Sequence, residues 1–101
     1  YDWSDDVSLN IPHEDLIIYK LHVRGYTKNR FSKVSDKGTF KALAAKIPYI
    51  KGLGVTAVEL MPVYEFVNSG ANTNFWGYDG GFYMAPRGDK TEVIPFMHTM
   101  V

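Results

Sequence analysis

The fold of this chain is decided by a nearly continuous apolar run, Val55-Thr56-Ala57-Val58-Glu59-Leu60-Met61-Pro62-Val63. A strand with one face in water alternates apolar and polar residues, whereas a strand buried on both faces is apolar almost throughout. The run therefore predicts a parallel strand that is covered on both faces.

The segment before this strand has the pattern of an interrupted helix. Apolar residues recur at helical spacing at Phe40, Leu43, Ile47, Ile50 and Leu53. Thr39 is the expected N-cap, and Pro48 predicts a break or kink near Lys46 with proline in the first turn of the continuing helix. Gly54 is expected just past the helix end, where a left-handed φ favours glycine.

Further upstream, Asp15–Arg24 reads as another strand, followed by a polar loop from Gly25 to Gly38. Its even positions Lys20, His22 and Arg24 share one face, and Lys20 is expected to pair with Glu59 across adjacent parallel strands. His22 is placed in the middle of the strand, which favours a structural role over sugar binding. Strand, helix and strand together form a right-handed βαβ unit.

A long loop, Tyr64–Asp89, is expected after the second strand, and long loops in compact domains are usually functional. Within it, Asn74–Tyr83 holds five aromatic rings and three glycines in ten residues. Aromatic rings carried on glycine-rich turns can stack on the apolar face of a sugar, although such rings can equally plug a small core. Thr91–Val101 has the pattern of a further helix.

Composition limits the function classes. The chain has 101 residues, with 11 basic and 11 acidic side chains, so neither nucleic-acid nor membrane binding is indicated. Cysteine is absent, which excludes disulfides. No spacing of histidine or acidic residues predicts a metal site or a cofactor. Residues 1–15 are polar, contain Pro12, and are expected to form a connector.

Three segments together resemble the α-amylase superfamily, glycoside hydrolase family 13, and most closely its pullulanase and glycogen-debranching branch. They are Ile18–Thr27, Leu53–Val63 and Asn74–Asp79. The resemblance implies that residues 16–101 form the N-terminal part of a (β/α)₈ TIM barrel, with the active site at the carboxyl ends of its strands. It also implies that Tyr78 stacks on the glucose ring beside the scissile bond, with Trp76 and Asp79 as flanking candidates.

The resemblance further implies a retaining hydrolysis of α-1,6 or α-1,4 glucosidic bonds, carried out by an Asp nucleophile and a Glu general acid. Those carboxylates belong to later strands than this sequence contains, so no catalytic residue is expected here. The chain alone is predicted to release no reducing sugar from an α-glucan. Lys20 also occupies a position that is often acidic in the family.

The expected partner is an α-glucan oligosaccharide or polysaccharide, and a cytoplasmic location is favoured for a debranching enzyme. The alternative is a non-catalytic carbohydrate-binding or self-associating module built from a barrel segment. Its unpaired strand edges would favour association with further copies.

Overall fold

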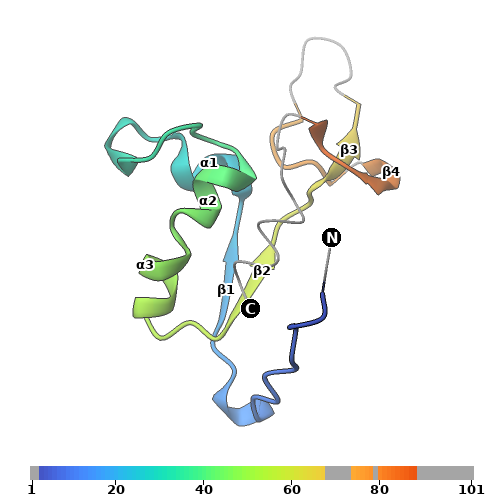
Figure 1. Ribbon diagram of the computed structural model, residues 1–101. Coiled ribbons are helices and arrows are strands. Elements are labelled where there is room, and N and C mark those ends of the chain that lie inside the picture. Colours follow the sequence, from blue (N-terminus) through green and yellow to red (C-terminus); the bar gives the residue numbers. More distant parts are fainter. Residues whose placement is uncertain (1–2, 68–73, 79, 89–101) are drawn as a thin grey trace.

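A computed structural model describes residues 3–67, 74–78 and 80–88 of the chain. Its centre is a parallel pair of strands, β1 (Ile18–Leu21) and β2 (Ala57–Leu60), joined through helices that lie to one side of them in Figure 1. Backbone hydrogen bonds extend the pair at both ends, from the Ala57 amide to the Ile17 carbonyl and from the Met61 amide to the Leu21 carbonyl. The expected strand–helix–strand order and the parallel pairing are confirmed.

The interrupted helix is confirmed as α2 (Phe40–Ala44) followed by α3 (Ile47–Gly52). The Thr39 hydroxyl accepts a hydrogen bond from the Ala42 amide at 3.2 Å and so caps α2. Pro48 lies in the first turn of α3, and Gly54 follows the helix with φ of 84°. These three local signals fix the helix boundaries because each acts within one turn of its own position.

The core lies between the strand pair and these helices. Its buried members come from β1, the segment after it, α2 and α3: Leu21, Val23, Phe40, Leu43, Ile47 and Ile50. Phe40 and Leu43 are fully buried. The last residue of the helical pattern, Leu53, does not join them and is exposed, because it lies past the end of α3 rather than on its inner face.

The first strand is shorter than expected, and the loop after it is partly helical. β1 ends at Leu21, and α1 (Val23–Lys28) begins two residues later, followed by the short 3-10 helix η2 (Arg30–Ser32). The alternation of Asp15–Arg24 misled the strand prediction because only Val23 and Arg24 of that segment fall in α1, too few residues to distinguish a helix from a strand. Val23 and Thr27, four residues apart, form the buried side of α1.

The expected loop after β2 contains an antiparallel hairpin, so that part of the loop prediction is wrong. β3 (Tyr64–Phe66) pairs with β4 (Gly80–Pro86), with register shifts on both sides of Glu65. Arg87 closes the pair by donating from its amide to the Val63 carbonyl at 2.8 Å and from Nη1 to the Phe66 carbonyl at 2.7 Å. Its guanidinium lies 4.1 Å from the centre of the Phe66 ring.

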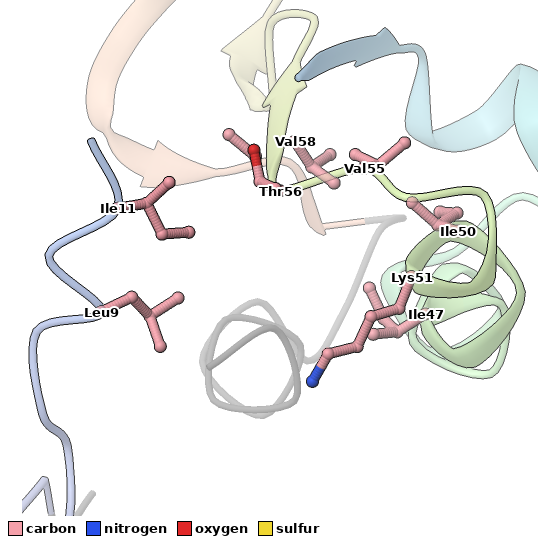
Figure 2. A pocket seen from close by; sticks show the side chains of 9 residues that line it. Leu9, Ile11, Ile47, Ile50, Lys51, Val55, Thr56 and Val58 are labelled. Carbon is pink, nitrogen blue, oxygen red and sulfur yellow. The ribbon is translucent and has the colours of Figure 1, made fainter. Parts of the chain in front are cut away.

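The expectation that the second strand is buried on both faces is also wrong for this chain. In β2 every apolar side chain is only partly buried, and Glu59 is exposed. β2 and α3, facing Leu9 and Ile11 of the N-terminal segment, line a cavity of about 430 Å³, shown in Figure 2. Neither Tyr78 nor Trp76 lines this cavity, so it is a surface separate from the aromatic turn described below.

The N-terminal segment contains one short 3-10 helix, η1 (His13–Asp15), within the region expected to be a connector. The helix expected at Thr91–Val101 lies outside the described residues. None of the helices in the described part of the chain has the length and apolar character that a membrane span needs.

Candidate sugar-binding site

His22 lies at the carboxyl end of β1, not in the middle of a strand as the sequence suggested. It is the N-cap of α1, and its Nδ1 accepts a hydrogen bond from the Gly25 amide at 3.0 Å. The side chain is buried, with 8% exposed. The argument that placed His22 away from the strand tip therefore fails, since strand β1 stops one residue before it.

The His22 ring contacts the aromatic turn, which is far away in the sequence. Its centre lies 4.7 Å from that of Phe75 and 5.7 Å from that of Trp76. Phe75 and Trp76 meet edge to face at 5.0 Å, a geometry that aromatic rings prefer. Three rings therefore form one cluster at the carboxyl end of β1.

A tight turn from Asn74 to Gly77 carries Phe75 and Trp76 and is followed directly by Tyr78. The Asn74 side-chain carbonyl accepts from the Gly77 amide at 2.9 Å, and Gly77 has φ of 76°. Gly77 lies against the buried Phe66 ring of β3, so closely that an added Cβ would be 2.8 Å from Phe66 Cε1. The turn leaves Trp76 52% and Tyr78 62% exposed.

The predicted pair between Lys20 and Glu59 is confirmed. The two residues are register partners in β1 and β2, and Lys20 Nζ lies 2.7 Å from Glu59 Oε1. The hydrogen bond and then the charge of Glu59 raise the pKa of the Lys20 amine above its ordinary value, and Tyr78 adds a smaller effect in the same direction. Both side chains of the pair are about half exposed (54% and 53%).

The structure places only some of the candidate site residues. Tyr78 and Trp76 lie on one exposed turn beside the end of β1, whereas Asp79 lies outside the described residues. Glu65 does not join Glu59, because its carboxylate pairs with Arg87 at 3.4 Å and accepts from the Gly88 amide.

Sequence reasoning missed His22 and Phe75 as members of the cluster. No strong local signal marked His22 as an N-cap, because histidine is not among the residues that N-caps prefer. For Phe75 no local signal existed, because its contact with His22 joins segments more than fifty residues apart. Among the described residues, no three acidic or histidine side chains gather as a metal site.

Comparison with known proteins identifies the relatives of this chain. It is 36% identical over 96 residues to chloroplastic isoamylase 1 of Arabidopsis thaliana, covering 85% of this chain and 12% of that protein. It is 39% identical over 87 residues to the glycogen operon protein GlgX homolog of Haemophilus influenzae, covering 78% of this chain and 13% of that protein. A malto-oligosyltrehalose trehalohydrolase of Saccharolobus solfataricus is 38% identical to it over 85 residues, covering 84% of this chain and 13% of that protein.

The chain spans about an eighth of the length of these relatives. No family model matches it. The relatives match most of its length, from 78% to 85% of this chain. The chain therefore belongs to glycoside hydrolase family 13, in which it corresponds to a segment of the isoamylase and glycogen-debranching proteins.

Proposed function

We propose that this chain forms the N-terminal part of the (β/α)₈ catalytic barrel of an α-glucan debranching glycosidase, with residues 1–15 as the connector before it. In this proposal, residues 16–101 supply part of the substrate-binding subsite. Tyr78 stacks on a glucose ring, and Trp76 and Asp79 flank it. The chemistry of bond cleavage belongs to carboxylates of later barrel strands, so this chain alone releases no reducing sugar.

The exposure of Tyr78 and Trp76 beside the carboxyl end of β1 carries the proposal. Active sites of (β/α)₈ barrels lie at the carboxyl ends of the parallel strands. β1 and β2 are parallel, and the cluster of His22, Phe75 and Trp76 lies where β1 ends. A ring that is 62% exposed at this end offers a flat apolar face to a sugar.

The half-exposed Lys20–Glu59 pair supports the same assignment. Lys20 lies in β1, two residues before His22. Tyr78 influences the pKa of the Lys20 amine, so its hydroxyl is within electrostatic range of the pair. An ammonium and a carboxylate next to a stacking ring are suitable hydrogen-bonding partners for sugar hydroxyls.

Calorimetric titration of the chain with maltoheptaose tests the stacking role. Tyr78→Ala is expected to weaken binding by about 2- to 12-fold, the equivalent of about 0.5–1.5 kcal/mol for loss of one stacking ring. Tyr49→Ala is a matched control, because Tyr49 is also 62% exposed but lies on α3. Equal affinities for Tyr78→Ala and the wild type would refute the stacking role.

A second candidate function is a self-associating or carbohydrate-binding module without catalysis. The observation that favours it is the apolar surface of the hairpin, where large side chains are exposed at Tyr64, Val67, Phe82, Tyr83 and Met84. Met84 is 97% exposed. Exposed apolar patches of this kind mark interaction surfaces, and sedimentation of the chain over a range of concentrations tests this one.

A further inference from the structure

We infer that His22 is the positioning residue of the aromatic turn Asn74–Tyr78: it fixes the end of β1 and supports Phe75 and Trp76, so that Tyr78 is presented to a sugar. The sugar-binding part of this inference rests on the proposed function. The positioning part does not, because it concerns contacts within the protein.

The orientation of the His22 ring is set by the backbone of α1. Its Nδ1 accepts from the Gly25 amide, so the neutral ring carries its proton on Nε2. A Cβ at Gly25 would lie 3.2 Å from Nδ1, which shows how closely the first turn of α1 approaches the ring. The ring is also 8% exposed and therefore has little room to change its rotamer.

The face and edge of this fixed ring contact the turn. Phe75 lies over it with a tilt of 31° between the ring planes, and Trp76 meets it at 72°. The close approach of Gly77 to Phe66 is a further anchor of the turn. His22 thus holds one side of the turn and Phe66 holds the other, with Tyr78 directly after Gly77.

Two substitutions separate the capping role of His22 from its ring contacts. His22→Asn keeps a side-chain acceptor suited to an N-cap but removes the ring. His22→Phe keeps a flat ring but removes the acceptor for the Gly25 amide. A purely structural cap predicts that only the Phe variant is affected, whereas a positioning ring predicts that the Asn variant loses the order of the aromatic turn.

Tryptophan fluorescence reads the turn directly. The chain has two tryptophans, Trp3 and Trp76, so in a Trp3→Phe background all tryptophan emission comes from Trp76. We expect His22→Asn to move the emission to longer wavelength and to raise the acrylamide quenching constant, with a lesser change for His22→Phe. Maltoheptaose affinity is expected to fall by about 2- to 12-fold for the Asn variant, as for loss of the stacking ring itself.

The outcomes distinguish the inference from the proposed function. A changed Trp76 signal in His22→Asn without sugar binding by any variant, wild type included, supports the positioning role and refutes the sugar site. Unchanged Trp76 emission and quenching in a folded His22→Asn variant overturn the positioning role, whatever the sugar affinity. If circular dichroism shows that His22→Asn is unfolded, His22→Phe is compared with His22→Leu. Both variants lack the acceptor for the Gly25 amide, and only His22→Phe keeps a ring. Equal Trp76 emission and quenching in the two variants overturn the inference, whereas a more exposed Trp76 in the Leu variant supports it.

Discussion

Gly77 is subject to two independent constraints. Its φ of 76° lies in the left-handed region, and the Phe66 ring fills the space where a Cβ would be. An L-residue there meets the steric penalty of the left-handed conformation and the overlap with a buried aromatic ring at the same time. Because Phe66 is also covered by the Arg87 guanidinium at 4.1 Å, the ring has limited freedom to move aside.

We therefore expect Gly77→Ala to destabilise the chain. The left-handed conformation costs about 1–2 kcal/mol, and the overlap adds about 1–3 kcal/mol. Urea denaturation followed by circular dichroism measures the sum. Gly81→Ala is the control, since nothing lies within 4 Å of a Cβ added at Gly81. Similar unfolding midpoints for the two variants would contradict this account of the turn.

At the scale of elements, α2 and α3 were predictable, whereas α1 and the hairpin were not. Thr39, Pro48 and Gly54 act on backbone groups within one turn of themselves, so their types alone place the ends of α2 and α3. β3 and β4 pair across an intervening segment, and their register depends on Arg87 and on irregularities around Glu65. Such pairing leaves no periodic signal in either strand.

The same distinction applies to the candidate site. Tyr78 and Trp76 could be selected because the family resemblance marks Asn74–Asp79 and the glycine-rich, aromatic composition marks Asn74–Tyr83. His22 was assigned to the wrong place, because alternating polarity extends past Leu21 into the first turn of α1. Its contact with Phe75 depends on how the turn folds back onto β1, which the pattern of neither segment encodes.

The cap of α2 gives a direct test of a predictable element. The Thr39 hydroxyl accepts from the Ala42 amide and donates to the Asp36 carbonyl at 2.7 Å. Thr39→Ala is expected to lower the free energy of unfolding by about 1 kcal/mol, because both partners lose the hydroxyl. Thermal unfolding checks the value, with Thr39→Ser as the control that retains the hydroxyl. An Ala variant as stable as the Ser variant would show that the cap is unimportant.

At the scale of the whole molecule, the described part of the chain contains two separate two-stranded sheets. A two-stranded sheet by itself is only marginally stable in water. The β1–β2 pair is stabilised by the core that it forms with the helices. The other, the β3–β4 hairpin, exposes Phe82, Tyr83 and Met84. An exposed apolar strand of this kind favours pairing with another chain.

We expect the isolated chain to associate with itself as its concentration rises. Sedimentation velocity over a range of concentrations measures this, and Phe82→Lys is expected to shift the distribution toward the monomer by adding charge to the exposed strand. Leu53→Lys is the control, because Leu53 is also exposed, at 55% against 63% for Phe82, but lies after α3. A monomer at every concentration would remove the support for the self-associating module.

The Lys20–Glu59 pair also bears on how β1 finds β2. A slip of one residue between the strands would place Lys20 opposite Val58 or Leu60, and it would turn the two charged side chains toward opposite faces. The other three register pairs of β1 and β2 join apolar or aromatic residues. The Lys20–Glu59 ion pair therefore distinguishes the native register from registers shifted by one residue. The pair thus helps to specify the register of β1 against β2, even though its half-exposed position makes the ionic interaction sensitive to salt.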